Sequence, residues 1–197
     1  MKRKRPRTGG GRVRIIAGRW RGRLLSVPDG AGLRPTPDRV RETLFSWLQS
    51  ALPGRRCLDL FAGSGALGLE AASREAGEVV LVEHASAVTR RLRESLRDLQ
   101  GAEQSGVDVV QAEALGWLRD GTPPDGGFDV VFLDPPYGKG LLQPALDALA
   151  AGGWLSDRAR LYIEFSAHEV PPTLPDGFAW LRDKTAGDVR FALAMRE

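Results

Sequence analysis

The sequence is poor in the residues that form disulfides and bind transition metals. It has one cysteine, Cys57, and two histidines among 197 residues. A single cysteine cannot form an internal disulfide, which agrees with a reducing compartment, and these few scattered side chains provide no metal-binding cluster. We therefore expect a cytoplasmic protein without a zinc or iron site, in which Cys57 is a small buried residue.

Long hydrophobic segments are also absent. No stretch approaches the roughly 18 apolar residues that a membrane-spanning helix requires, and the charged N-terminus lacks the apolar region of a signal peptide. Hydrophobic residues still make up 42% of the chain, enough for one soluble globular domain with a full-sized core. We expect a monomeric protein with no membrane partner.

Acidic residues are missing from the first 28 positions. This segment contains ten basic side chains and no acidic one, whereas residues 29–197 contain 18 basic and 25 acidic residues, a net charge of −7. A basic arm attached to an acidic body is typical of a protein that binds a polyanion. We interpret residues 1–12 as a disordered basic tail, for which a purely solubilising role is the alternative.

The segment that follows the tail combines short hydrophobic runs with arginine, tryptophan and glycine. The runs at 13–18 and 23–27 flank the sequence Arg-Trp-Arg-Gly at 19–22. This pattern predicts a small β-hairpin with exposed Arg and Trp side chains. We therefore expect residues 13–35 to form a hairpin arm that contacts nucleic-acid phosphates. The candidate RNA-binding residues, which are all basic or aromatic, are Arg14, Arg19, Trp20, Arg21, Arg23, Arg34 and Arg39.

Beyond this arm the sequence alternates between helical and strand patterns. A cap and proline signal at Thr36-Pro37-Asp38 predicts the start of a first helix. Hydrophobic patterning then predicts strands at 56–61, 78–83, 107–111, 128–133 and 160–165, and helices at 66–76, 85–100, 113–119 and 141–150. Strand-like runs at 178–181 and 189–193 predict a C-terminal antiparallel hairpin. We therefore expect residues 36–197 to form a Rossmann-like, doubly wound α/β domain with about seven strands.

A glycine-rich segment follows the first strand and opens a helix. Gly63, Gly65 and Gly68 match the pattern G-x-G-x-x-G, and Glu83 ends the next strand. This arrangement is typical of a site for an adenosine cofactor, in which the acid binds the ribose hydroxyls. Asp59 lies four residues before the first glycine, where it would crowd a pyrophosphate but suits the amino group of a methionine moiety.

A further acidic residue, Glu113, follows the third of these strands. One interpretation is that it contacts an adenine, and the alternative is a helix-terminal Glu that interacts favourably with the helix dipole. The candidate cofactor-binding residues, which follow the predicted strand ends, are Asp59, Ala62, Gly63, Ser64, Gly65, Glu83, Glu113 and Ala114.

The tetrapeptide Asp134-Pro135-Pro136-Tyr137 follows the hydrophobic run at 128–133. A buried strand there places it at the carboxyl edge of the sheet, where open α/β folds bind ligands. Its carboxylate, its proline-stiffened carbonyl and its aromatic ring suit a planar base with an exocyclic amino group. We therefore predict Asp134, Pro135 and Tyr137 as catalytic residues. A strand-ending turn with a solvated Asp is the alternative.

In this order, the glycine segment, its acids and the tetrapeptide resemble those of S-adenosylmethionine-dependent methyltransferases that modify exocyclic amines. The segments Arg14–Arg23 and Arg34–Phe45 are similar, more narrowly, to the RsmD-type 16S rRNA guanine-N2 methyltransferases of bacteria, and the similarity runs from about residue 13 to the C-terminus. The resemblance implies S-adenosylmethionine as cofactor and 16S rRNA or the small ribosomal subunit as substrate. Glu113 departs from the family pattern, which usually has Asp there.

Under this hypothesis, Asp134 and the Pro135 carbonyl accept hydrogen bonds from the guanine amine while Tyr137 stacks on the base. Asp59 and Glu83 hold the cofactor. Three alternatives stay open. An adenine-N6 methyltransferase acting on DNA or RNA would use the same tetrapeptide, because it serves either amine. The glycine pattern alone would also suit a nicotinamide-dependent oxidoreductase, and the basic arm a non-catalytic RNA-binding assembly factor.

Overall fold

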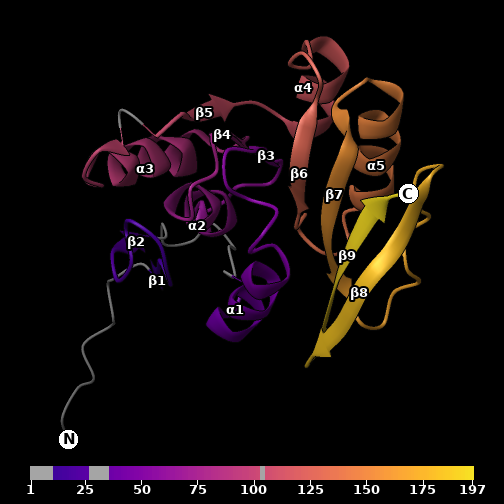
Figure 1. Cartoon of the computed structure of the whole chain (residues 1–197), viewed down its shortest axis with the longest axis horizontal. Coiled ribbons are helices and arrows are strands. Elements are labelled where there is room, and N and C mark those ends of the chain that lie inside the picture. The colour runs from indigo at the N-terminus through magenta and orange to yellow at the C-terminus, as the bar shows by residue number, and fades with distance from the viewer. Residues whose placement is uncertain (1–10, 27–35, 103–104) are drawn as a thin grey trace, which may run out of the picture.

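A computed structural model describes residues 11–26, 36–102 and 105–197. Its core is a seven-stranded sheet with the order β5-β4-β3-β6-β7-β9-β8 (Figure 1). The strands of this sheet are β3 (Arg56–Asp59), β4 (Glu78–Glu83), β5 (Val107–Gln111), β6 (Phe128–Leu133), β7 (Leu155–Ser166), β8 (Phe178–Ala186) and β9 (Val189–Arg196). The helices are α1 (Asp38–Trp47), α2 (Ala66–Ser73), α3 (Ser86–Arg97), α4 (Ala114–Asp120) and α5 (Leu142–Ala151). The predicted doubly wound α/β class is confirmed.

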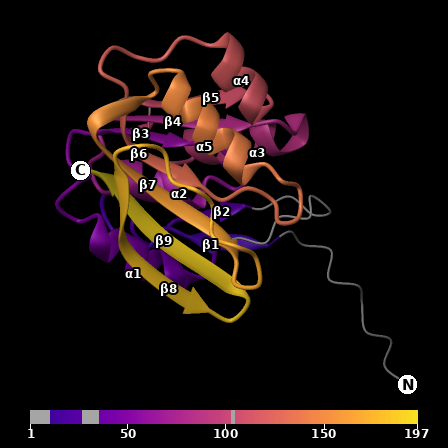
Figure 2. The same cartoon turned by 90° about the vertical axis from the view of Figure 1, so that its right-hand side faces the viewer.

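The sheet is parallel over most of its width and antiparallel at one edge. Strands β5, β4, β3, β6 and β7 pair in parallel, while β9 pairs antiparallel with both β7 and β8. Figure 2 shows this C-terminal hairpin along the edge of the sheet. The chain moves outward from β3 to β5 and then returns to the other side of β3 for β6, so the strand order reverses between β3 and β6. Open α/β sheets form a ligand crevice at such a reversal.

Helices cover both faces of the sheet and divide the core into two hydrophobic clusters. One cluster combines one face of the sheet with α1, α2 and α3 and includes Leu44 and Leu92. The other lies beneath α4 and α5 and includes Leu146. Successive strand residues point to opposite faces, so β3 contributes Cys57 to the first cluster and Leu58 to the second. Cys57 is buried, as expected.

A two-stranded antiparallel hairpin precedes the sheet and lies beside α2 and α3 (Figure 1). It consists of β1 (Arg12–Arg14) and β2 (Leu24–Ser26), and its hydrophobic residues belong to the same core cluster as α1, α2 and α3. Trp20 is also buried there, and its indole N–H donates to the Gln100 carbonyl at 2.9 Å. The expectation that Trp20 is displayed to nucleic acid is therefore wrong. Two three-residue strands bury little surface of their own. The buried Trp20 ring therefore helps to attach the hairpin to the domain.

A buried glutamate anchors the hairpin to α2. Glu70 accepts the backbone N–H groups of Ile16 at 2.7 Å and Ala17 at 3.0 Å. Arg41 of α1 is buried as well, 3.7 Å from Glu70, and its guanidinium donates to the Arg14 carbonyl at 2.7 Å. Buried charges are costly unless they are paired and hydrogen-bonded. Displacing the hairpin would break these bonds, so the cluster holds it in one position on the domain.

The first helix begins differently from the sequence expectation. α1 starts at Asp38 with Pro37 as its N-cap, and no side chain forms a cap hydrogen bond. Thr36 Oγ1 instead donates to Asp134 Oδ2 at 3.1 Å. The fixed φ of proline prepares the chain for the helix, which leaves the Thr36 hydroxyl for this long-range contact.

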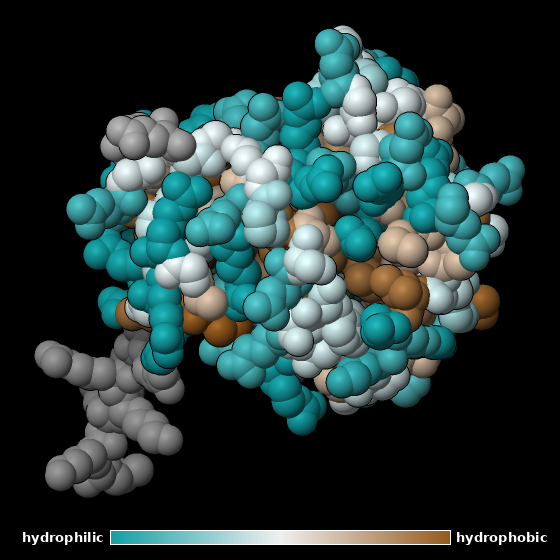
Figure 3. Space-filling model, viewed as in Figure 1, coloured by the Kyte–Doolittle hydropathy of each residue, from teal (hydrophilic) through white to brown (hydrophobic). Residues whose placement is uncertain are grey.

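The face seen in Figure 3 is mostly hydrophilic, with hydrophobic residues in small patches. The large hydrophobic side chains that are exposed in the described ranges are Leu24, Tyr137, Val170, Trp180 and Leu181. Two of them, Tyr137 and Val170, line the same surface pocket. No helix in the described part of the chain is long and apolar enough to cross a membrane.

Candidate active site

Four acidic residues lie at or just beyond the carboxyl ends of four parallel strands. Asp59 ends β3, Glu83 ends β4, Glu113 follows β5 and Asp134 follows β6. Parallel strands end at the same edge of a sheet, so the topology brings the predicted cofactor-binding and catalytic residues to one edge. They flank the reversal of strand order between β3 and β6.

The glycine segment forms a tight turn between β3 and α2. Gly63 (φ 50°) and Gly65 (φ 76°) adopt left-handed backbone conformations, which disfavour residues that carry a Cβ. A Cβ on Gly65 would lie 2.5 Å from Leu92 Cδ1, and one on Gly68 would lie 2.1 Å from Leu81 Cδ2. The first two glycines therefore shape the loop, and the third lets α2 pack closely against β4.

Ala62 and Ser64 complete the loop. Ala62 donates its backbone N–H to the Val82 carbonyl at 2.9 Å and accepts the N–H of Gly65 at 2.7 Å. Ser64 is buried. These bonds fasten the loop to the end of β4, so its backbone has a defined shape without a ligand.

Glu83 connects the glycine loop to the start of α3. Its Oε2 accepts the N–H of Gly63 at 3.0 Å, and its Oε1 accepts the N–H of Ala85 at 2.7 Å. His84 Nδ1 lies 3.1 Å from the same Oε1. A carboxylate offers about four lone-pair sites, so an acceptor site remains for a ribose hydroxyl. Glu83 thus has a structural role, and its contact with a ribose hydroxyl stays a prediction.

Asp59 is buried beneath the loop. Its Oδ2 accepts the N–H of Gly68 at 2.9 Å. Burial raises the pKa of Asp59 to about 7, a rise that the Gly68 hydrogen bond opposes and the nearby charge of Glu83 increases. An opposite charge favours the ionised form of a buried carboxyl, so Asp59 fits a ligand that brings a positively charged amino group.

Glu113 is exposed at the start of α4. It is the N-cap of this helix, and its carboxylate accepts the N–H groups of Leu115 at 3.1 Å and Gly116 at 2.7 Å. The helix-terminal interpretation therefore accounts for its side chain. The next residue, Ala114, is buried. A contact of Glu113 or Ala114 with an adenine stays a prediction.

Asp134 is partly buried just beyond β6. Burial raises its pKa well above the ordinary value, the nearby charge of Glu164 raises it further, and the hydrogen bond from Thr36 lowers it. A carboxylate with a raised pKa accepts a proton more readily than an ordinary aspartate does. Asp134 thus accepts a hydrogen bond from Thr36, and its raised pKa favours the binding of a proton.

A buried glutamate of β7, Glu164, binds the tyrosine of the tetrapeptide. Its Oε1 accepts the Tyr137 hydroxyl at 2.8 Å, and its Oε2 accepts the Tyr162 hydroxyl at 2.7 Å. Tyr137 is nevertheless 45% exposed. Its hydroxyl is held while part of its ring stays open to the surface, which suits a ring that stacks on a base.

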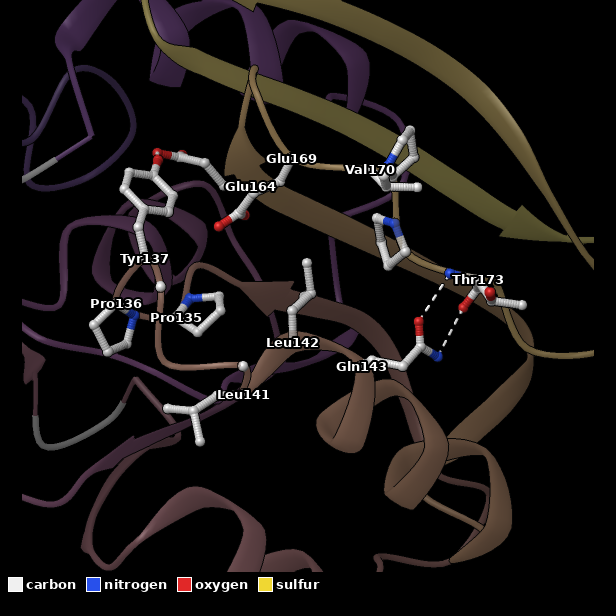
Figure 4. A pocket seen from close by; sticks show the side chains of 14 residues that line it. Pro135, Pro136, Tyr137, Leu141, Leu142, Gln143, Glu164, Glu169, Val170 and Thr173 are labelled. Atoms are coloured by element: carbon white, nitrogen blue, oxygen red, sulfur yellow. Dashed lines mark hydrogen bonds between the residues drawn. The ribbon is translucent and has the colours of Figure 1, made fainter.

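A pocket of about 380 Å³ lies beside the tetrapeptide (Figure 4). Pro135 and Tyr137 form one side, and the Glu164 side chain points toward the Tyr137 hydroxyl. Leu142 of α5 and the loop that follows β7 complete the wall. This size is within the range of small-molecule sites in proteins, and the pocket therefore has room for a planar base next to the predicted catalytic residues.

Three residues that contact the tetrapeptide or its neighbours are absent from the residues predicted from sequence, namely Thr36, Tyr162 and Glu164. The signal for Glu164 is a single acid inside the hydrophobic run 161–165, because a charged residue in a buried strand needs partners or a function. Thr36 carries no such signal, since a Thr before Pro is an ordinary helix start. Its contact with Asp134 spans 98 positions and exists only in the folded chain.

The predicted RNA-binding side chains differ in how they are held. Arg19 donates two hydrogen bonds to the Ala72 carbonyl, and Arg23 donates one to the Asp98 carbonyl. These two side chains are exposed, as are those of Arg14, Arg21 and Arg39, whereas Trp20 is buried. Arg34 lies outside the described residues. The hairpin thus presents positive charge from a fixed element.

Comparison with known proteins agrees with this arrangement. The family model "Conserved hypothetical protein 95" matches residues 13–195. Ribosomal RNA small subunit methyltransferase D of Escherichia coli (strain K12) is 46% identical over 191 residues, which cover 96% of this chain and 93% of that protein. The protein of the same name from Haemophilus influenzae is 42% identical over 183 residues, 93% of each chain. The chain belongs to the RsmD family.

A solved structure from Escherichia coli, yhhF, has the same fold, with a TM-score of 0.85, 44% identity, and coverage of 95% of this chain and 99% of that one. The two N-terminal segments that resemble the RsmD family both contact the rest of the domain. Arg14–Arg23 contains the docked hairpin turn, and Arg34–Phe45 supplies Thr36 to Asp134. The hairpin segment thus contacts α2, the helix that follows the glycine loop, and Thr36 contacts the first residue of the tetrapeptide.

Proposed function

We propose that the protein transfers a methyl group from S-adenosylmethionine to the exocyclic N2 amine of a guanine in small-subunit rRNA. The observation that carries the proposal is the position of Asp134, just beyond β6 and at the same sheet edge as Asp59 and Glu83. Relatives named as ribosomal RNA small subunit methyltransferases support rRNA as the substrate.

The residues at the sheet edge fit S-adenosylmethionine. Asp59, a buried carboxyl with a raised pKa, would pair with the amino group of the methionine moiety. Glu83 would accept a ribose hydroxyl, and the loop of Gly63 and Gly65 lets a ligand approach the backbone. Ala62, Ser64, Glu113 and Ala114 are the further contacts that we propose. When bound, the cofactor supplies a methyl group on a positively charged sulfur.

The target amine requires help because its lone pair is delocalised into the guanine ring. The Asp134 carboxylate and the Pro135 carbonyl would accept its two N–H groups and stabilise the positive charge that grows on the nitrogen. Tyr137 would stack on the base and align the amine for in-line transfer. The nitrogen gains the methyl group and loses one proton, which the raised pKa of Asp134 equips that residue to accept.

The basic arm would bind the RNA backbone. Arg14, Arg21 and Arg39 are exposed, and arginine side chains contact phosphates without reading sequence. A paired guanine has to leave its stack to reach Asp134, at a cost of about a few kcal/mol. A surface fixed beside α2 can hold the surrounding RNA while the base is displaced.

Nucleoside mass spectrometry of small-subunit rRNA tests the proposal. RNA from a strain that lacks this gene should be missing one N2-methylguanosine, and the purified enzyme should restore it. An N6-methyladenosine product would contradict guanine-N2 specificity. Thermal unfolding with S-adenosylhomocysteine or NAD tests the cofactor separately, and we expect stabilisation by S-adenosylhomocysteine only.

A further inference from the structure

Glu164 is a buried acid on the wall of the pocket beside the tetrapeptide. It is only 3% exposed, yet it faces the pocket together with Pro135 and Tyr137 (Figure 4). The described residues that line this pocket include no lysine or arginine. The Glu164 carboxyl group is therefore not paired with a lysine or arginine of the pocket wall. An N–H group of a bound base is a chemically suitable partner for it.

Glu164 and Asp134 form a pair of acids at the target side of the site. The Thr36 hydroxyl donates to Asp134 Oδ2 at 3.1 Å. Leu133 of β6 is the parallel register partner of Ile163 of β7, so the next residues, Asp134 and Glu164, lie at the same level of neighbouring strands. The nearby charge of Glu164 raises the pKa of Asp134. Two acceptors side by side suit a ligand edge that presents two neighbouring donors.

Guanine and adenine differ at this edge. Guanine presents the N1–H donor next to its N2 amine, whereas adenine presents the N1 lone pair next to its N6 amine. A carboxylate accepts the first and repels the second. A single acid at the amine cannot separate the two bases, because both amines donate N–H, but a second acid beside it can.

We propose that Glu164 selects guanine over adenine by accepting the N1–H of the base whose amine is bound by Asp134. This inference rests on the proposed function, in which Asp134 binds the target amine. Glu164 is then a specificity-determining residue that touches the base directly.

The hydrogen bonds of Glu164 prepare it for this role. The Tyr137 and Tyr162 hydroxyls each donate to one carboxylate oxygen, and a carboxylate offers about four lone-pair sites. Acceptor capacity therefore remains for N1–H. Burial raises the pKa of Glu164, and the hydrogen bonds from the Tyr162 and Tyr137 hydroxyls oppose that rise. These donors favour the ionised, accepting form and fix its orientation.

Base analogues at the target position test the inference. Small-subunit particles can be reconstituted with 2-aminopurine or 2,6-diaminopurine riboside in place of the target guanosine. Both analogues keep the 2-amine and carry a lone pair at N1, and they differ from each other at position 6. We expect the wild-type enzyme to methylate each of them on the order of 10- to 100-fold less efficiently than guanine, measured as kcat/KM. Equal efficiency on guanine and both analogues would overturn the inference without any mutation.

The variant Glu164→Gln tests the residue itself. Its amide can donate to an N1 lone pair as well as accept from N1–H, so kcat/KM for the analogues should come within a few-fold of that for guanine. Tyr137→Phe is the matched control, because it removes one hydrogen bond of Glu164 and keeps the carboxylate. Its rate should fall on all three bases with the wild-type preference intact.

The outcomes separate the two proposals. A Glu164→Gln enzyme that keeps the wild-type preference for guanine would exclude Glu164 as the selecting residue. A wild-type enzyme that yields N6-methyladenosine would instead contradict the proposed function. If Glu164→Gln does not fold, kcat/KM of the wild-type enzyme on the three bases still decides whether a protein acceptor binds the N1–H of guanine.

Discussion

The cofactor side and the target side of the site hold their carboxyl groups in different ways. On the cofactor side, Asp59 and Glu83 accept backbone N–H groups of the glycine loop and of the adjoining helix starts. On the target side, Asp134 and Glu164 accept hydroxyl groups of side chains. Backbone donors belong to the fold, whereas side-chain donors can be removed one at a time.

This difference predicts how the two sides respond to substitution. Loss of a carboxyl group on the cofactor side leaves buried backbone donors without partners, so stability and cofactor binding should fall together. A change on the target side removes contacts between side chains, so the chemistry should fall while the fold and the cofactor site persist.

The largest effect should come from Asp134→Ala. Removal of the group that binds the amine should lower the methyl-transfer rate on the order of 10²- to 10⁴-fold. The affinity for S-adenosylmethionine should stay within a few-fold of wild type, because Asp134 is proposed to contact the amine only. Calorimetry and a radioactive methyl-transfer assay measure the two quantities. Substantial turnover by the variant would exclude the role assigned to Asp134.

The next largest effect should come from Glu83→Ala. This variant leaves the Gly63 and Ala85 N–H groups without their acceptor, so S-adenosylmethionine binding should weaken by about 1–3 kcal/mol and the midpoint of thermal unfolding should fall. Glu78→Ala is the matched control, since Glu78 starts the same strand and pairs with Arg56 at the surface. Unchanged cofactor affinity would mean that Glu83 has only its structural role.

A smaller effect should come from the titration of Asp59. Its pKa is raised from 3.8 to about 7 in the folded protein, so the folded state binds a proton that the unfolded chain has released. The contribution of Asp59 to stability should therefore fall as the pH rises through this window. Urea unfolding of wild type and Asp59→Asn across the window measures it, and the variant should lack this part of the pH dependence.

The same titration gives a test with the cofactor. A positively charged amino group lowers the pKa of a neighbouring carboxyl, so S-adenosylmethionine binding below pH 7 should release a proton from Asp59. Calorimetry in buffers with different ionisation enthalpies detects that proton. Its absence in wild type would contradict a contact between Asp59 and the amino group.

The smallest effect per residue should come from the arm. Replacement of Arg19, Arg21 and Arg23 by Gln should flatten the slope of log K against log salt for RNA binding by about 0.7–0.9 for each phosphate that the variant no longer neutralises. Cofactor affinity should not change. We expect a larger drop in activity than from deletion of residues 1–11, because the docked hairpin keeps its charges in register with the site. If neither variant changes the slope, the arm does not bind the RNA.

Arg182→Gln is the matched control for the arm, because Arg182 is an exposed arginine of the edge strand β8. It should leave the salt slope unchanged. A change equal to one third of that of the three-residue hairpin variant would mean that RNA binding follows net charge and has no preferred surface.

Most of the fold could be predicted from the sequence because its signals are local. Hydrophobic periodicity located every strand of the large sheet, and the glycine segment and the tetrapeptide marked the ends of β3 and β6. The errors concern residues whose environment depends on distant segments. Trp20 lies in a polar, arginine-rich turn but is buried against the α3–β5 connection, and Thr36 resembles a helix cap but binds Asp134.

Helix α2 joins the two functions proposed for the molecule. Its first residue follows the glycine loop, and Ser73 at its other end accepts the Arg19 and Trp20 N–H groups of the arm. The helix has eight residues, a length of about 12 Å. It is thus a rigid spacer between the surface proposed for RNA and the proposed methyl donor. All eight residues of α2 are buried. An inserted residue would change that span by about 1.5 Å and turn one end by about 100° relative to the other, so this helix should not tolerate a change in length.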